Sequence, residues 1–212
     1  VDGESMIEFI KVTNLNHSCI SRVSAICKTH TNILFYERAS CDLQKYVLSI
    51  DIPMNKRLIR SYMLQLIEAV SYCHCNMIAH LDIKPNNIIL HTDGRIELID
   101  FGTSCNFNPF IEEFCSDVTT RLYCPPENLL GFERYYSHVA TDMWSIGICM
   151  AFMLSMGKMQ YFQALLCDDN IIIHNINDLC LYSSWKDIIP DISPSEEDFL
   201  SSLLKYDPRE RI

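Results

Sequence analysis

The sequence predicts an α+β fold, in which short strands and longer helices occupy separate blocks of the chain. Its length of 212 residues and its 49% apolar content are enough for one domain with a sizeable core. Short apolar runs separated by turn residues occur in the first half. Helical periodicity dominates residues 55–75 and the chain after residue 125. This separation of strands and helices is typical of α+β proteins.

The first expected elements are a helix over residues 5–15 and a pair of strands between residues 20 and 36. The runs ISRVSAI and TNILFY are rich in apolar and β-branched residues, and the polar segment Lys28–Asn32 lies between them. A polar turn between two such runs predicts two short strands joined by a hairpin.

Pro53 precedes a predicted helix over residues 55–75. Apolar residues recur there near a period of 3.6 residues, at Leu58, Ile59, Met63, Leu66, Ile67 and Val70. The apolar runs 88–90 and 96–99 then flank His91-Thr92-Asp93-Gly94-Arg95. An Asp-Gly pair between two such runs predicts a β-hairpin.

The last block of the chain is predicted to be helical. Its longest apolar stretch, Met143–Gly157, is shorter than the roughly 18 to 20 residues needed to span a bilayer, so we interpret it as a buried core helix without a membrane role. Its methionines are interpreted as core residues rather than as a partner-binding groove. The acidic run Glu196-Glu197-Asp198 suits the start of a further helix.

Charge and cysteine content exclude several functions. The chain has 17 Lys and Arg against 27 Asp and Glu, and it contains no basic run that could follow a phosphate backbone, so we expect no nucleic-acid partner. Eleven cysteines is an odd number in a chain too long for a disulfide-stapled miniature domain. We therefore expect reduced thiols and an intracellular protein.

The residues that carry chemistry form two short motifs. The segment His80–Asn87 has the sequence HLDIKPNN, and Asp100-Phe101-Gly102 follows the predicted hairpin. Two acids and an amide oxygen are suitable ligands for Mg²⁺. A lysine beside them suits a transferred phosphate, and an acid not used by the metal can accept a proton from an alcohol. This set of residues predicts phosphoryl transfer.

The two motifs resemble the catalytic loop and the metal-binding loop of eukaryotic protein kinases. Further motifs follow in the family's order: Pro125-Pro126-Glu127, then DMWSIG from Asp142, then Arg211 in DPRER. Upstream, Leu15-Asn16-His17 matches the turn after the family's αC helix. The segment VTTRLYCPPENLLG is most similar to the cyclin-dependent and mitogen-activated kinase branch. The resemblance covers nearly the whole chain and implies a kinase-like fold, with a partial small lobe and a mostly helical large lobe.

The resemblance implies a role for each matching residue. Asp82 would orient the substrate hydroxyl and accept its proton, and Lys84, which resembles Ser/Thr kinases, would contact the γ-phosphate of ATP. Asn87 and Asp100 would bind Mg²⁺. Thr120 would link the substrate-docking loop to Asp82 and Lys84.

Other matching positions imply an ATP site and structural supports. Glu8 would be the αC glutamate, Tyr36 the gatekeeper, Glu37 and Ala39 the hinge, and Ile89 the floor under adenine. His80 and Phe101 would stack with Val12 and Val23, Asp142 would hold the backbone of the catalytic loop, and Glu127 would pair with Arg211. Residues 1–36 would then be a remnant of the small lobe. Residues 37–212 would be the hinge and large lobe without its C-terminal helix.

The sequence departs from the family pattern at three places, the catalytic loop, the activation loop and the region before Glu8. Leu81 replaces the Arg that normally pairs with a phosphorylated activation loop, and Cys115 occupies the aligned phosphosite, with Ser116 the nearest alternative. We therefore expect that activation-loop phosphorylation does not regulate this protein. The sequence also has no Gly-x-Gly-x-x-Gly motif and no lysine before Glu8. Because residue 1 is Val rather than Met, we expect an N-terminally incomplete sequence.

These observations leave alternatives open. A Ser/Thr protein kinase using ATP and Mg²⁺ on a protein substrate is the principal hypothesis. A catalytically idle, kinase-like regulator that binds a kinase or its substrate is the competing one. Cys73-His74-Cys75 with His80 nearby also suggests a zinc site, although this spacing is poor for one. Cys115 is either a redox-sensitive thiol or simply a small, tolerated residue.

Overall fold

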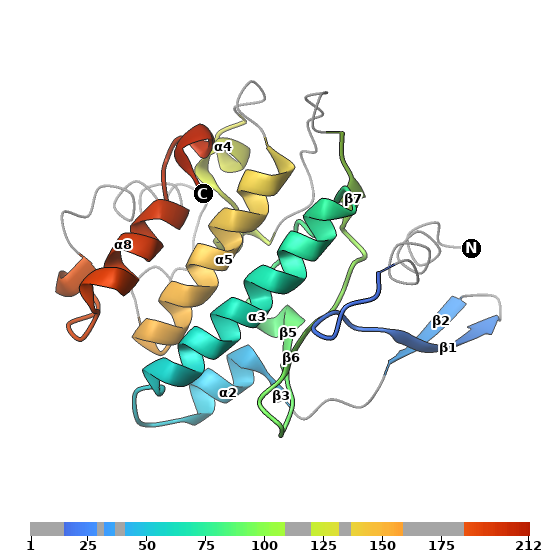
Figure 1. Ribbon diagram of the computed structural model, residues 1–212, viewed down its shortest axis with the longest axis horizontal. Coiled ribbons are helices and arrows are strands. Elements are labelled where there is room, and N and C mark those ends of the chain that lie inside the picture. The colour runs from blue at the N-terminus through green and yellow to red at the C-terminus, as the bar shows by residue number, and fades with distance from the viewer. Residues whose placement is uncertain (1–14, 29–31, 37–40, 109–119, 132–136, 159–184) are drawn as a thin grey trace.

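The computed structural model has the predicted α+β fold, with small sheets beside a body of packed helices (Figure 1). The residues that it describes are 15–28, 32–36, 41–108, 120–131, 137–158 and 185–212. The helix expected over residues 5–15 lies, except for Leu15, outside this part of the chain. Leu15, Cys19 and Ile20 are buried in the main core.

Strand β1 (Val23–Lys28) pairs antiparallel with β2 (Asn32–Tyr36), which confirms the first predicted hairpin. In Figure 1 this hairpin lies to one side of the helices. The strand begins later than the sequence predicted, because Ile20 makes an isolated parallel bridge to Leu98 instead. The amide of Ser21 donates to the carbonyl of Leu98 at 2.9 Å, and this bond ties the N-terminal segment to the next sheet.

The second sheet has the order β3-β5-β6 and is antiparallel throughout. Its strands are β3 (Cys41–Asp42), β5 (Ile88–Leu90) and β6 (Ile96–Leu98). The predicted Asp-Gly turn joins β5 to β6, with Gly94 at φ +85°, a conformation that favours glycine. A third, two-stranded sheet pairs β4 (Ile78–Ala79) with β7 (Cys105–Asn106).

Helix α3 (Lys56–Cys75) confirms the predicted long helix to within one residue. The side chain of Asn55 caps its first turn by accepting a hydrogen bond from the amide of Arg57 at 2.8 Å. Its buried residues recur at helical spacing, at Ile59, Tyr62, Met63, Leu66, Ala69, Val70 and Cys73. A shorter helix, α2 (Leu43–Ser49), precedes it and is capped by Asp42.

Helix α5 (His138–Ser155) is the central helix and packs against both α3 and α8 (Pro194–Leu203) (Figure 1). Most of its residues are buried, including Met150 and Met153, so the prediction of a core helix is confirmed. Gly147 allows the close approach of α8, because a Cβ at this position would lie only 2.7 Å from Leu204 Cδ2. No described helix is long and apolar enough to cross a membrane.

Short elements complete the described structure. They are α4 (Pro126–Leu129) and the 3₁₀ turns η1 (Pro85–Asn87), η2 (Arg121–Tyr123), η5 (Trp185–Asp187) and η6 (Pro208–Glu210).

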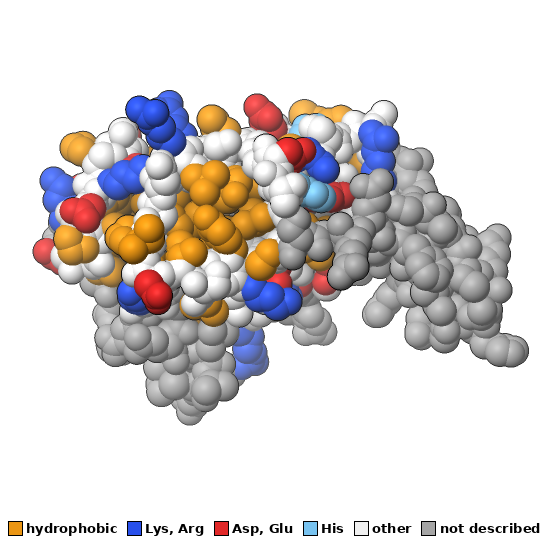
Figure 2. Space-filling view, turned by 90° about the horizontal axis from the view of Figure 1, so that it is seen from below, with side chains coloured by type: hydrophobic (Ala, Val, Ile, Leu, Met, Phe, Trp, Pro, Cys, Tyr) orange, Lys and Arg blue, Asp and Glu red, His pale blue; other side chains and the backbone are white. Residues whose placement is uncertain are grey.

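Apolar side chains also gather on the face shown in Figure 2. Leu48 and Ile52, in and after α2, are the most exposed large hydrophobic residues of the described chain.

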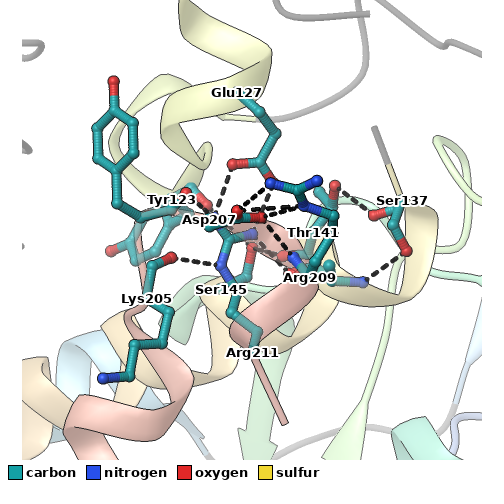
Figure 3. A network of polar contacts seen from close by, with 11 residues as sticks. Tyr123, Glu127, Ser137, Thr141, Ser145, Lys205, Asp207, Arg209 and Arg211 are labelled. Atoms are coloured by element: carbon teal, nitrogen blue, oxygen red, sulfur yellow. Dashed lines mark hydrogen bonds and ion pairs between the residues drawn. The ribbon is translucent and has the colours of Figure 1, made fainter. Parts of the chain in front are cut away.

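An ion pair joins α4 to the end of the chain (Figure 3). The guanidinium of Arg211 donates to Oε1 and Oε2 of Glu127 at 2.6 and 2.7 Å, as the resemblance implied. It also donates to the carbonyls of Ala140, Lys205 and Tyr206, and it lies 4.9 Å from the ring centroid of Trp144. The pair is inaccessible to solvent and is therefore a structural support rather than a catalytic element.

Candidate active site

The predicted catalytic loop, residues 80–87, connects β4 to β5 and is anchored by His80. The imidazole of His80 is completely buried and packs against Phe101, with ring centroids 4.7 Å apart. Its Nδ1 accepts from the amide of Asp82 at 3.2 Å, so its proton is on Nε2, which lies 3.0 Å from the carbonyl of Ile99. His80 thereby connects the catalytic loop to the start of the Asp100-Phe101-Gly102 motif.

Asp142 holds the backbone of the same loop from α5. Its carboxylate is completely buried and accepts from the amides of His80 at 2.9 Å and Leu81 at 2.8 Å. These bonds keep Leu81 at φ +63°, a left-handed conformation that a branched side chain rarely adopts. The expected contact of Asp142 with the loop backbone is confirmed.

Asp82 lies at the centre of a cluster of side-chain contacts, and its carboxylate is buried. Its Oδ1 accepts from the hydroxyl of Thr120 at 2.6 Å and from the Thr120 amide at 3.2 Å. Its Oδ2 accepts from Lys84 Nζ at 2.6 Å and from Asn87 Nδ2 at 3.1 Å. Lys84 also donates to the Thr120 hydroxyl at 2.8 Å. The predicted catalytic residue Asp82 is therefore surrounded by the other three, Lys84, Asn87 and Thr120.

The donor set of the predicted metal site fits a hard cation. Asn87 uses its amide nitrogen for two bonds, to the carbonyl and the carboxylate of Asp82, which leaves its Oδ1 available. The amide of Ile99 donates to the carbonyl of Asn87 at 3.0 Å and holds the end of β6 against η1. Asp100 follows Ile99 and is exposed, at φ +66°. A carboxylate and an amide oxygen are ligands that suit Mg²⁺.

The residues predicted to contact ATP are only partly described. Ile89 lies in β5, opposite Asp42 and Glu97, and is half-buried. Tyr36 is the last residue of β2. Glu8, Glu37 and Ala39 lie outside the described residues, as does Val12. The structure brings together Asp82, Lys84, Asn87 and Thr120, and the predicted nucleotide contacts stay predictions.

The structure does not favour the zinc alternative. Within the described ranges, no three His, Cys, Asp or Glu residues are arranged to bind a metal ion by themselves. Burial and the nearby carboxylate of Asp142 raise the pKa of the Cys73 thiol to about 12, so it stays protonated at neutral pH. Cys75 is exposed, and His80 packs in the core. Cys19, Cys41, Cys73, Cys75 and Cys149 form no disulfide, and Cys115 lies outside the described chain.

One contact at this site was missed from the sequence. His74, considered only as a zinc ligand, instead lies with Nε2 2.8 Å from Oδ2 of Asp142. The two residues are 68 positions apart, and no local pattern links them. The apolar pattern of residues 55–75 predicts a helix that ends near His74. Only the packing of α3 on α5 brings the His74 side chain to the carboxylate of Asp142.

A hairpin beside a helical body, with an acid, a lysine and an amide meeting in one loop, is the arrangement of a kinase-like fold. The sequence supports the same family independently of the structure. The family model described as the protein kinase domain matches residues 3–212. The chain therefore belongs to the protein kinase family.

Proposed function

We propose that this protein is a Ser/Thr protein kinase that transfers the γ-phosphate of ATP to a protein hydroxyl. The observation that carries the proposal is the cluster in which Thr120, Lys84 and Asn87 hold the carboxylate of Asp82. Lys84, two residues after Asp82, resembles Ser/Thr rather than Tyr kinases. The segment from Val118 to Gly131 supports the cyclin-dependent and mitogen-activated branch.

In this proposal Asp82 is the catalytic base. Its two oxygens are fixed by neighbouring donors, so the carboxylate would stay in one orientation while a substrate hydroxyl approaches. It would accept the hydroxyl proton as the oxygen attacks the γ-phosphorus. Lys84, 21% exposed, would release one of its contacts and place its charge on the transferred phosphate.

Asn87 and Asp100 would bind the metal. Mg²⁺ bound there would neutralise charge on the ATP phosphates. The free Oδ1 of Asn87 and the exposed carboxylate of Asp100 support this assignment. Glu8, Tyr36, Glu37, Ala39 and Ile89 would form the αC and adenine contacts. Residues 1–36 would be the small-lobe part, and residues 37–212 the hinge and large lobe.

A catalytically idle regulator that binds a kinase or its substrate is the second candidate. Leu81 is the observation that favours it, because this side chain is completely buried and apolar at the position where the family carries Arg. Such a regulator, or a kinase that needs an activating subunit, implies a regulatory protein partner. The odd number of cysteines, 11, and the absence of a disulfide at Cys19, Cys73 and Cys149 support an intracellular location for either candidate.

The test uses the full-length protein and measures two properties. Binding is followed as the rise in melting temperature on adding Mg²⁺ and ATP, for the wild type and Asp100→Asn. Catalysis is followed as transfer of labelled γ-phosphate to a generic protein substrate, for the wild type and Asp82→Asn. We expect a Mg²⁺-dependent rise that Asp100→Asn reduces, and a transfer rate that Asp82→Asn lowers at least a hundredfold.

The outcomes separate the two candidates. Phosphate transfer that needs Asp82 establishes the kinase. Binding of a kinase or a kinase substrate without any transfer establishes the regulator. A full-length protein that neither binds Mg²⁺-ATP nor transfers phosphate refutes the kinase proposal.

A further inference from the structure

Two hydroxyl side chains, Thr103 and Ser104, follow the Asp100-Phe101-Gly102 motif, and residues 100–104 are called the metal loop below. Ser104 is 5% exposed, and its hydroxyl donates to the carbonyl of Phe101 at 2.6 Å. Its amide donates to the same carbonyl at 3.1 Å. The two bonds close a turn over residues 101–104, and they satisfy the carbonyl of a residue that is completely buried.

The hydroxyl of Thr103 connects this turn to the catalytic loop. It donates to the carbonyl of His80 at 3.3 Å, while the ring of Phe101 packs on the ring of His80. Strand β7 follows the metal loop directly and pairs Cys105 with Ala79, which precedes His80. The metal loop is therefore attached to the catalytic loop by a hydrogen bond, a ring contact and a strand pair.

The turn matters because the backbone of Asp100 is left-handed, at φ +66°. Residues other than glycine rarely adopt this conformation, and it persists only where the neighbouring structure enforces it. On one side of Asp100, Ile99 is fixed because its amide donates to the carbonyl of Asn87 at 3.0 Å. On the other side, Phe101 is fixed by its ring packing and by the two bonds from Ser104. Loss of the Ser104 hydroxyl would weaken one of these two anchors.

The carboxylate of Asp100 also lies against the turn itself. A Cβ at Gly102 would be only 3.3 Å from Oδ1 of Asp100, so this oxygen lies close to the Gly102 backbone. Its position therefore depends on where the turn holds Gly102. Because Asp100 is exposed, its carboxylate can move away from this position if the turn opens.

We propose that Ser104 and Thr103 are positioning residues for the metal loop. Their hydroxyls keep the turn closed and attached to the catalytic loop, and so they hold the carboxylate of Asp100 in place. Their effect on the use of Mg²⁺ rests on the proposed function, in which Asp100 is a metal ligand. Their effect on the turn does not depend on that function.

The chain offers a matched control in Ser202. Its hydroxyl donates to the carbonyl of Phe199, again three residues earlier and again at 2.6 Å. This second bond lies within α8, and Ser202 is partly buried. Removing either hydroxyl deletes one bond from a serine to a phenylalanine carbonyl, but only Ser104 belongs to the metal loop.

Five variants of the full-length protein separate the effect of the hydroxyl from that of packing. Ser104→Ala and Thr103→Val each remove one hydroxyl, and Ser202→Ala is the control. Ser104→Thr and Ser104→Val add side chains of nearly the same shape, but only threonine keeps the hydroxyl.

Two properties are measured for each variant. Hydrogen exchange of the Ser104 amide, without metal or nucleotide, reports the turn directly because this amide donates to Phe101. The Mg²⁺ concentration that gives half-maximal phosphate transfer reports the metal site. For Ser104→Ala we expect about tenfold faster exchange and a half-saturating Mg²⁺ concentration raised about fivefold to tenfold, with the KM for the protein substrate within about twofold.

The other variants have distinct expected results. Thr103→Val should change both properties in the same direction by about twofold to threefold, because its bond is the longer one. Ser104→Thr should be close to the wild type, and Ser104→Val should be as impaired as Ser104→Ala. Ser202→Ala should leave both properties unchanged.

Unchanged exchange in Ser104→Ala would overturn the proposal. Equal impairment of Ser104→Thr and Ser104→Val would do the same, because the effect would then be one of packing. Faster exchange with an unchanged Mg²⁺ dependence in an active protein would refute the link from the turn to Asp100. If Ser104→Ala does not fold, Ser104→Cys replaces it, since a thiol is only a weak donor. A wild type without transferase activity refutes the kinase function, and the exchange measurement still decides the role of Ser104.

Discussion

The hydroxyl of Thr120 is shared between the two most important predicted catalytic side chains. It donates to Asp82 at 2.6 Å and accepts from Lys84 at 2.8 Å. Thr120→Ala removes both contacts, and we expect kcat to fall about tenfold to a hundredfold, since Asp82 then loses one of its fixed donors. Thr120→Ser keeps the hydroxyl and should retain most of the activity. Steady-state transfer kinetics measure this, and an unimpaired Thr120→Ala variant would contradict it.

Leu81 is the basis of our prediction about regulation by phosphorylation. Its side chain is completely buried and carries no charge, so it cannot pair with a phosphate on the activation loop. We expect phosphatase treatment to leave the transfer activity of the full-length protein within twofold of untreated samples. The Ser116→Ala variant serves as a second check, because Ser116 is the nearest hydroxyl to the aligned site. Activity that disappears on dephosphorylation and returns on rephosphorylation would refute this expectation.

At the scale of elements, helix α8 begins with a capping box. Ser193 Oγ accepts from the amide of Glu196, and Glu196 Oε2 accepts from the amide of Ser193 at 2.7 Å and from Lys56 Nζ at 2.9 Å. Burial raises the pKa of Glu196, but the hydrogen bonds from Ser193 and Lys56 outweigh burial and lower it from 4.5. The unfolded chain therefore binds this proton more readily than the folded protein does.

This pKa difference gives the capping box a pH dependence. Its contribution is complete above the unfolded pKa and disappears as the pH falls through the lower folded pKa. We expect Glu196→Gln to lower the free energy of unfolding at pH 7 by about 0.5–1 kcal/mol, a small value because both partners are partly exposed. The difference from the wild type should shrink as the pH falls below 4.5 and through the lower pKa of the folded protein. Urea unfolding at several pH values measures it, with exposed Asp198→Asn as the control.

The elements that the sequence predicted are those with a local signal. Helix α3 has seven buried residues at helical spacing, and the hairpin of β5 and β6 has its Asp-Gly turn. Helix α2 was missed because only Leu43 and Val47 of its seven residues are buried. Two buried positions are too few to reveal a helical period in the sequence. Strands β4 and β7 have two residues each, and only tertiary packing pairs them.

The residues of the candidate site also differ in how far the sequence predicts them. Asp82, Lys84 and Asn87 lie within six residues, so their chemistry is visible in the sequence itself. Thr120 lies 38 residues after Asp82 and was identified only through the resemblance to kinases. The contact of His74 with Asp142 depends on how two helices pack, and no spacing rule predicts it.

At the scale of the whole molecule, the Glu127–Arg211 pair joins segments that are 84 residues apart (Figure 3). The Arg211 side chain is inaccessible to solvent, and Glu127 is almost so. Truncating one partner would leave the other charge buried and unpaired, which typically costs 3–5 kcal/mol. The pair therefore connects the end of the chain to α4, close to the segment that contains Thr120.

We expect Arg211→Ala to lower the free energy of unfolding by about 3–5 kcal/mol, measured by urea denaturation. Arg211→Lys should also be destabilised, because an ammonium group cannot make the two parallel bonds to Glu127. Arg209→Ala is the control: Arg209 pairs with Asp207 two residues earlier, is largely exposed, and should change little. The double variant Glu127→Leu/Arg211→Leu removes both charges, so it should be more stable than Arg211→Ala. A loss below about 1 kcal/mol in Arg211→Ala would show that this pair contributes little to holding the segment around Arg211 against α4.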